Sequence, residues 1–238
     1  MNFVLITAGG IGSRMHMEIP KQFLNVYDKP IIIYTLEAFQ KHPNIDGIGV
    51  ICLEGWQDIL NAYIKQFGIT KVKWIVKGGA TGQESIRNGL NRLAEDCNEN
   101  DTVLVHDGNR PLVTQETISD CIIKCHQYGS AVTIIPCTTS VLQKSKMEDR
   151  ESNVALDRDM LAMTQTPHAF PFKKLWWAHQ EAEKRGITNS VASHALLIEL
   201  GETVHFSLGN ETNIKITNTN DLKIFKALLT SGNERDLP

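Results

Sequence analysis

Short apolar segments alternate with longer amphipathic segments along most of the chain, and this alternation restricts the possible folds most strongly. The short segments predict strands, at residues 3–8, 47–52, 72–76, 102–106 and 131–136. The longer segments predict helices, at residues 31–41, 56–67, 83–94 and 115–128. Strands that alternate with helices are typical of a mostly parallel sheet covered by helices on both faces. The sequence therefore predicts an α/β, Rossmann-like fold.

The alternation is interrupted at residues 137–159, which are polar and carry charged side chains such as Lys144 and Arg150. An unstructured segment of this length is uncommon inside a compact domain, so we expect a projecting β-arm that contacts a partner. The predicted elements after this arm are helices at 172–183 and 191–200, strands at 203–207 and 213–216, and a closing helix at 219–229. We expect a single domain over residues 1–238, with a frayed tail at 232–238.

Composition and charge exclude several classes of partner. The chain has 238 residues, of which 42% are hydrophobic, and a net charge of −3. This charge gives no electrostatic reason to expect nucleic acid or an anionic membrane as a partner. The beginning of the sequence lacks the features of a signal peptide, and no apolar run is long enough to cross a membrane. The five cysteines form no CxxC pair, so we expect reduced thiols and a cytoplasmic protein.

A glycine-rich loop follows the first predicted strand and is the clearest candidate binding site. It reads Ala8-Gly9-Gly10-Ile11-Gly12-Ser13-Arg14-Met15, and Pro20-Lys21-Gln22 follows shortly after. Glycine allows a close backbone approach, so successive amides can point at one anion. Arg14 and Lys21 add fixed positive charge. The loop therefore predicts a site for a triphosphate.

Two other glycine-rich motifs fit this loop less well. A dinucleotide-binding fingerprint counted from Gly10 would place Met15 at its third glycine, where the helix and strand must approach closely. A P-loop requires a Gly-Lys pair, and none occurs in the sequence. A glycine turn without function remains the third interpretation.

Four motifs occur in order along most of the chain. The first is the glycine-rich loop with Pro20-Lys21-Gln22-Phe23. The others are His106-Asp107-Gly108-Asn109-Arg110-Pro111, then Arg158-Asp159 with Gln165-Thr166-Pro167, and finally Asn213-Ile214-Lys215-Ile216-Thr217 with Asp221-Leu222. Each motif alone is weak, but together, in this order and at this spacing, they resemble the 2-C-methyl-D-erythritol 4-phosphate cytidylyltransferases and the related ribitol 5-phosphate cytidylyltransferases.

The resemblance implies a homodimer in which a β-arm crosses to the second subunit, which gives residues 137–159 a role. It implies that Arg14, Lys21 and Lys215 face the phosphates of CTP as the catalytic residues. It also implies a nucleotide site at Ala8, Gly9, Gly10, Gly12, Gly78, Gly79 and Ser85. The acceptor, a small polyol phosphate, would bind Asp107, Arg110, Ser140, Arg158 and Thr166, some of them across the dimer.

The expected chemistry suits these residue types. The acceptor is a phosphomonoester with a second pKa of about 6, so it is a dianionic nucleophile near neutral pH. Its approach to CTP requires compensation of negative charge by amides, lysine, arginine and Mg²⁺. We expect Mg²⁺ as the cofactor, held mainly by the CTP phosphates, with Asp107 as a weak candidate ligand. Arg158 would hold the acceptor phosphate, to which a guanidinium can bond bidentately.

The sequence departs from the family pattern mainly near the acceptor and ribose. Gly82 stands where the family has an arginine, Ala80 where an acid is frequent, and His168 where glutamine is usual. Gly10, Gln22-Phe23 and Asp28-Lys29-Pro30 are more similar to the ribitol phosphate branch.

We therefore expect a cytidylyltransferase that forms a CDP-polyol, with ribitol 5-phosphate as the favoured acceptor. Methylerythritol phosphate, a CTP-binding protein without turnover, and an NAD-dependent oxidoreductase are the alternatives.

Overall fold

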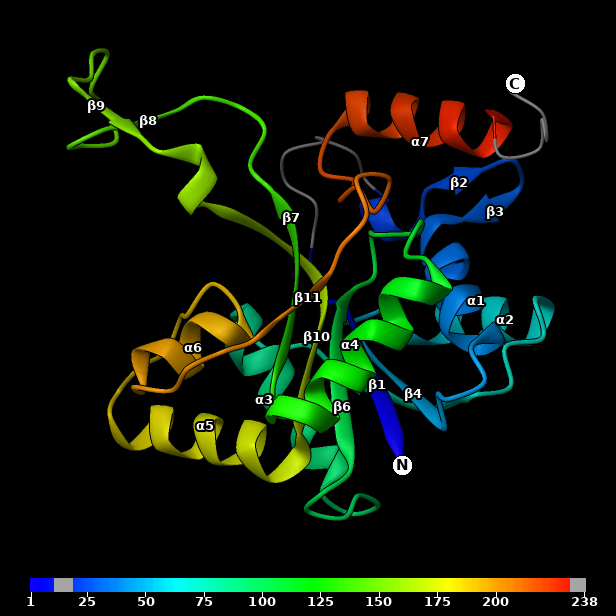
Figure 1. Ribbon diagram of the computed structural model, residues 1–238. Helices are drawn as coiled ribbons and strands as arrows, with labels where there is room; N and C mark the ends of the chain where they lie inside the picture. Colours follow the sequence, from blue (N-terminus) through cyan, green and yellow to red (C-terminus); the bar gives the residue numbers. More distant parts are fainter. Residues whose placement is uncertain (11–18, 232–238) are drawn as a thin grey trace.

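The computed structural model describes residues 1–10 and 19–231 (Figure 1). The predictions for Gly12, Arg14 and the tail 232–238 lie outside the described residues.

A seven-stranded sheet forms the centre of the described molecule, in the order β11-β7-β10-β6-β1-β4-β5. Its strands are β1 (Asn2–Ala8), β4 (Gly47–Cys52), β5 (Val72–Lys77), β6 (Thr102–Asp107), β7 (Ala131–Pro136), β10 (Ala162–Pro171) and β11 (Phe206–Leu208). All neighbours pair in parallel except β10, which is antiparallel to both β6 and β7. The central strands are apolar because helices cover both faces. The predicted mostly parallel α/β sheet is confirmed.

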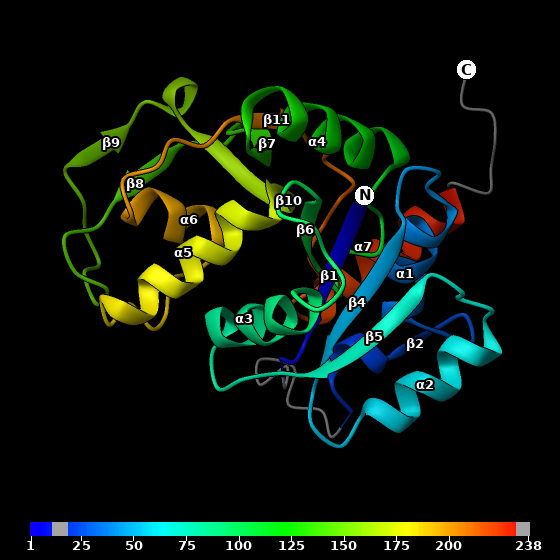
Figure 2. The ribbon, with the colours of Figure 1, turned by 90° about the horizontal axis from the view of Figure 1, so that it is seen from below.

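Helices pack on both faces of this sheet (Figure 2). One face carries α1 (Ile31–Lys41), α2 (Gln57–Gln66) and α4 (Gln115–Tyr128), whose apolar side chains join one core cluster. The other face carries α3 (Gly82–Leu93), α5 (Phe172–Lys184) and α6 (Ser193–Glu199), which share a second cluster. Among the described residues, no helix is both long and apolar enough to cross a membrane.

A third, smaller core closes the end of the molecule near the carboxyl edge of the sheet. There α7 (Thr219–Ser231) lies over the short strands β2 (Asn25–Val26) and β3 (Lys29–Pro30), as Figure 1 shows. Phe225 of α7 packs in this cluster with Val26 and Ile216. The cluster therefore joins the last helix to the segment 213–217, which carries Lys215.

The segment 137–159 projects from the body and contains a two-stranded hairpin, β8 (Val141–Gln143) with β9 (Val154–Leu156). Figure 1 shows it extending away from the sheet. A short 3-10 turn (Arg158–Met160) leads from this arm into β10. The use of the arm in dimerisation stays a prediction.

One strand of the main sheet was not predicted, and one predicted strand does not form. β10 was not predicted, because its first half is polar and Pro167 lacks the amide hydrogen that a strand ladder needs. The structure accommodates this proline at a shift in register between Thr164 and His168. The strand predicted at 213–216 is wrong: this segment joins loop 108–110 by one backbone bond, from the Ile216 amide to the Asn109 carbonyl, and extends no ladder.

Candidate active site

The carboxyl ends of the parallel strands meet at one edge of the sheet and bring the predicted motifs together. β1 and β6 are adjacent, with Thr7 opposite Asp107 in register. The chain order reverses between them, and such a switch point is where open α/β sheets bind ligands. A cavity of about 540 Å³ opens there. The predicted site residues that line it are Ala8, Gly9, Gly10, Lys21, Gly79, Ser85, Asp107, Thr166 and Lys215.

The remaining predicted residues lie elsewhere. Arg110 contacts Asp107 beside the cavity. Gly78 packs against Gly9, so that a β-carbon added to Gly9 would lie 3.7 Å from the Cα of Gly78. Ser140 and Arg158 belong to the arm, where both are exposed and do not line this cavity. Arg158 instead donates to the carbonyl of Thr138 at 3.1 Å. One chain alone therefore does not bring the arm residues to the cavity.

Gln22 fixes the start of the glycine-rich loop. Its buried side-chain amide donates to the carbonyls of Ala8 at 2.7 Å and Gly10 at 3.1 Å. Gln22 lies in a short 3-10 turn (Lys21–Phe23), so the same turn positions Lys21 on the cavity. In the sequence, Gln22 stands in a family-like motif, and no further signal indicates that it bonds the glycine-rich loop.

The loop between β5 and α3 forms the opposite wall, and side chains of α3 shape its backbone. The Gly79 amide donates to Oγ of Ser85 at 2.9 Å, and the Ala80 amide donates to Glu84 at 2.7 Å. A Cβ on Gly79 would clash with Glu84, so this position requires glycine. Thr81 caps α3 by accepting from the Glu84 amide. Glu84 thus places a carboxylate next to Ala80, where the family pattern often has an acid.

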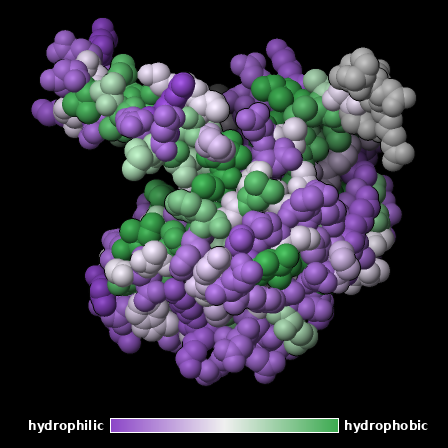
Figure 3. All heavy atoms as spheres, viewed as in Figure 1, coloured by the Kyte–Doolittle hydropathy of each residue, from purple (hydrophilic) through white to green (hydrophobic). Residues whose placement is uncertain are grey.

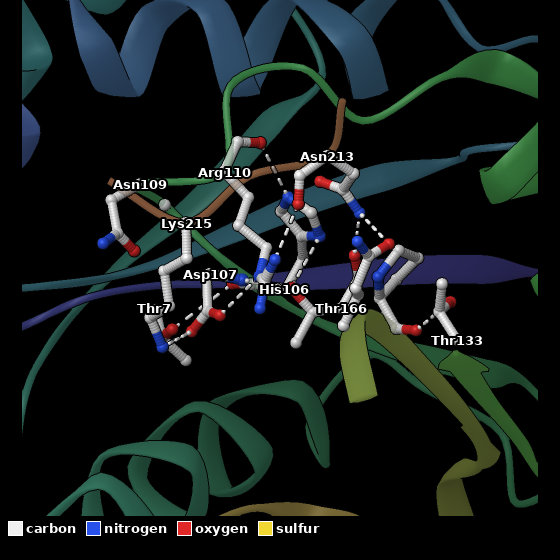
Figure 4. Close-up of polar contacts among 12 residues, drawn as sticks. Thr7, His106, Asp107, Asn109, Arg110, Thr133, Thr166, Asn213 and Lys215 are labelled. Carbon is white, nitrogen blue, oxygen red and sulfur yellow. Dashed lines mark hydrogen bonds and ion pairs between the residues drawn. The ribbon is translucent and has the colours of Figure 1, made fainter. Parts of the chain in front are cut away.

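Asp107 is held between two cations (Figure 4). Its carboxylate accepts from Nε of Arg110 and from Nζ of Lys215, each at 3.0 Å. Burial alone would raise the pKa of Asp107, but Lys215 and Arg110 outweigh it and lower the pKa to about 2. Asp107 is therefore ionised at neutral pH and fixes the direction of both cations.

Asparagines join the segment that carries Lys215 to the rest of the site. Asn109 donates its side-chain amide to the carbonyl of Ile216, and Asn213 donates to the carbonyl of Thr166 at 2.8 Å. Arg110 also donates to the carbonyl of Asn213 at 2.7 Å. Both asparagines lie within the quoted motifs, which was the only sequence signal of this role. They link β6, β10 and the 213–217 segment into one network.

His106 is buried and its hydrogen bonds define its tautomer. Nε2 lies 3.1 Å from the carbonyl of Arg110, which can only accept, so Nε2 carries the proton. Burial, the largest effect, lowers the pKa of His106 to about 4, so the ring is neutral and Nδ1 is an acceptor. The hydroxyl of Thr166 therefore donates to Nδ1 at 3.1 Å, while its oxygen accepts from the Asp107 amide. His106 acts through Thr166 and has no free group to offer a substrate.

The described residues provide no group of three or more His, Cys, Asp or Glu side chains able to hold a metal. Both carboxylate oxygens of Asp107 already accept from cations. The role of Asp107 as a weak metal ligand stays a prediction. What the site offers is backbone amides and lysine ammonium groups around one cavity, which suits several phosphate groups bound together.

Comparison with known proteins also points to a site for a nucleoside triphosphate, because the relatives are cytidylyltransferases. The sequence pattern of the family described as IspD, 2-C-methyl-D-erythritol 4-phosphate cytidylyltransferase, matches residues 2–231. A ribitol-5-phosphate cytidylyltransferase of Lacticaseibacillus paracasei is 44% identical over 94% of this chain and 96% of its own. One of Vibrio parahaemolyticus is 42% identical over 96% of each chain. A 2-C-methyl-D-erythritol 4-phosphate cytidylyltransferase of Clostridium botulinum is 36% identical over 96% of this chain and 97% of its own.

Solved structures share the fold. The 2-C-methyl-D-erythritol 4-phosphate cytidylyltransferase of Thermus thermophilus aligns with a TM-score of 0.74 and 27% identity, covering 94% of this chain and 97% of its own. A synthase from Anaerococcus prevotii aligns with a TM-score of 0.80 over 96% of each chain, at 23% identity. The likeness therefore covers the whole fold and not one motif.

Proposed function

We propose that this chain, which belongs to the 2-C-methyl-D-erythritol 4-phosphate cytidylyltransferase family and is a cytidylyltransferase, joins CTP to ribitol 5-phosphate. The products are CDP-ribitol and pyrophosphate. Two relatives above 40% identity carry the ribitol name, whereas the methylerythritol relative from Clostridium botulinum is 36% identical. This difference favours ribitol 5-phosphate over methylerythritol phosphate.

The observation that carries the proposal is the placement of Lys21 and Lys215 on one cavity together with Gly9 and Gly10 of the glycine-rich loop. Lys21 would face the β- and γ-phosphates of CTP, and Lys215 the α-phosphate. Arg14, for which we propose the same role as Lys21, lies outside the described residues. The loop at Gly79 and Ser85 would hold the cytosine and ribose.

The reaction needs no protein nucleophile. An oxygen of the acceptor phosphate, dianionic because its second pKa is about 6, attacks the α-phosphorus of CTP. The bond from that phosphorus to the oxygen bridging to the β-phosphate breaks, and pyrophosphate leaves with the electron pair. Lys21 and Lys215 stabilise the charge that develops in this step. Asp107 and Thr166 would bind acceptor hydroxyl groups and so orient the attacking phosphate.

We propose that Mg²⁺ enters bound to the phosphates of CTP, as part of the substrate. Two observations support this: the described residues lack a cluster of metal ligands, and Asp107 is engaged by Arg110 and Lys215. Mg²⁺ commonly binds in this way, largely through substrate phosphates. We also propose a cytoplasmic location, supported by five unpaired cysteines.

We propose a homodimer in which the arm of one subunit completes the acceptor site of the other with Arg158 and Ser140. The arm and its base expose apolar side chains, including Leu142 (62%), Met147 (91%) and Met160 (82%). Figure 3 shows hydrophobic colour along the arm and on the body below it. Exposed apolar surface of this kind is typical of an interface. Both arm residues would otherwise lie away from the cavity.

The test is pyrophosphate release with CTP, Mg²⁺ and a panel of polyol phosphates. The proposal predicts the highest kcat/KM with ribitol 5-phosphate. A preference for methylerythritol phosphate would assign the protein to isoprenoid synthesis instead. CTP binding in calorimetry without pyrophosphate from any acceptor would contradict turnover.

A further inference from the structure

The cavity continues beyond the predicted site into an inner pocket, which we define by His168 of β10, His179 of α5 and Ser193 of α6. These side chains are 3%, 3% and 2% exposed. Within the described part of the chain, Nε2 of His168, both ring nitrogens of His179 and Oγ of Ser193 are buried and have no hydrogen-bond partner. Buried polar groups normally have partners, so three such residues on one cavity wall indicate a ligand that supplies them.

The inner pocket is polar but uncharged. Burial, with His194 beside the ring, lowers the pKa of His168 to about 3, and burial lowers that of His179 to about 4. Both imidazoles are neutral at pH 7. A neutral imidazole has one nitrogen that donates and one that accepts, so each ring can bond a hydroxyl group. Neutral donors and acceptors suit hydroxyl groups and do not suit phosphate.

The pocket adjoins the proposed acceptor site. Thr166 and His168 are two residues apart on β10 and line the same cavity, together with Asp107 and Lys215. Only Pro167 separates the two residues, and two residues of chain span at most about 7 Å, so His168 lies within one short polyol chain of Thr166. An acceptor whose first hydroxyl groups meet Asp107 and Thr166 therefore extends its remaining hydroxyl groups toward His168 and Ser193.

We propose that the inner pocket binds the hydroxyl groups at the far end of the acceptor's carbon chain and selects acceptors by the length of that chain. This inference rests on the proposed function, since it requires a polyol phosphate as acceptor. It assigns His168, which stands where the family usually has glutamine, to substrate selection.

The test compares kcat/KM for ribitol 5-phosphate with that for the three-carbon glycerol 3-phosphate. Ser193→Ala removes a hydroxyl with little change of volume, and His168→Leu removes the unpartnered ring nitrogen. Each should lower kcat/KM for ribitol 5-phosphate roughly tenfold, the usual scale for one buried hydrogen bond. The value for glycerol 3-phosphate, which is too short to reach the pocket, and the KM for CTP should change less than about twofold. His168→Gln keeps a polar group and should recover much of the selectivity.

Ser130→Ala serves as the matched control, because Ser130 is buried but does not line the cavity. Thermal unfolding verifies that each variant folds. If His168→Leu does not fold, Ser193→Ala alone tests the inference. Equal losses with both acceptors would overturn the inference while leaving the proposed function intact. A raised KM for CTP would also overturn it, since the pocket would then serve the nucleotide. Wild-type protein that turns over no polyol phosphate would overturn both.

Discussion

The hydroxyl of Thr166 donates to Nδ1 of His106 at 3.1 Å, and this bond connects the base of the site to its acceptor wall. The same ring donates from Nε2 to the carbonyl of Arg110. Since the Thr166 oxygen also accepts from the Asp107 amide, the imidazole orients two side chains of the proposed acceptor site at once. His106 is therefore a positioning residue in a site where Asp107 and Thr166 would touch the substrate.

Substitution of His106 separates its two hydrogen bonds. Asparagine places a polar atom near the position of Nδ1 and keeps the contact with Thr166, whereas glutamine reaches the position of Nε2 and keeps the contact with Arg110. We expect His106→Gln to raise the KM for the acceptor roughly tenfold, because Thr166 loses its orientation. His106→Asn should raise it less.

The measurement is a KM and kcat comparison for acceptor and CTP in both variants. The KM for CTP should stay close to that of the wild type. Equal damage to both substrates in both variants would mean that His106 only supports the fold.

Gln22 should contribute to both stability and nucleotide affinity. Gln22→Glu would place acceptor oxygens against the carbonyls of Ala8 and Gly10, so we expect a loss of about 1–3 kcal/mol in the free energy of unfolding. The KM for CTP should rise, because the glycine loop and Lys21 are no longer fixed. Gln22→Met, which has a similar shape and no acceptor oxygen, is the control and should be milder. Urea unfolding with CTP titration measures both effects. A Gln22→Glu variant as stable as the wild type would show that the bonds from Gln22 to Ala8 and Gly10 do not hold the loop.

Buried histidines should make the protein sensitive to mild acid. The pKa of His106 is lowered to about 4 from an ordinary value near 6.5, so the unfolded chain binds protons more readily than the folded protein between these values. The free energy of unfolding should therefore decrease as pH falls from about 6.5 to about 4. Asp107, whose pKa is about 2, keeps its charge in this range and contributes a loss only at lower pH.

Urea unfolding at several pH values from 7 to 4.5 measures this dependence. In His106→Asn the free energy of unfolding should fall less over this pH range than in the wild type, by up to a few kcal/mol, since one pKa unit corresponds to about 1.4 kcal/mol. A stability that rises on acidification would contradict the neutral imidazole.

The sequence predicted the elements that obey simple periodicity. Helices 31–41 and 115–128 begin and end where the amphipathic pattern does. β10 could not be predicted in this way, because Pro167 and the polar residues before it are tolerated only through pairing with β6 and β7 on both sides. The segment 213–216 has the composition of a strand but is held by Asn109, Arg110 and Thr166 instead.

In the candidate site, too, some residues could be predicted from sequence motifs and others could not. The motifs predicted that Asp107, Thr166 and Lys215 come together, because each lies in a family-like motif. The inner pocket was not predictable, since His168, His179 and Ser193 come from three separate elements and form no sequence pattern. Only tertiary packing brings them to one wall.

The arm predicts complementation between inactive variants. Arg158→Ala and Lys215→Ala should each abolish most activity. In a mixed dimer one site would receive both substitutions and the other neither. Random exchange makes half of the dimers mixed, so mixing should restore about a quarter of wild-type activity. The control is each variant refolded alone, which should gain nothing. No recovery from a sample shown to be mixed would place Arg158 and Lys215 in the same subunit's site.

Lysine side chains on the glycine-loop cavity should stabilise transfer of the cytidylyl group to the acceptor phosphate. The decisive measurement is single-turnover formation of CDP-ribitol by Lys21→Ala, with the exposed Lys223→Ala as control. We expect the rate of Lys21→Ala to fall by roughly 10²–10³, the usual scale for loss of one charge-stabilising donor, and the rate of the control to stay unchanged. A folded Lys21→Ala protein with the wild-type rate would show that Lys21 has no such role.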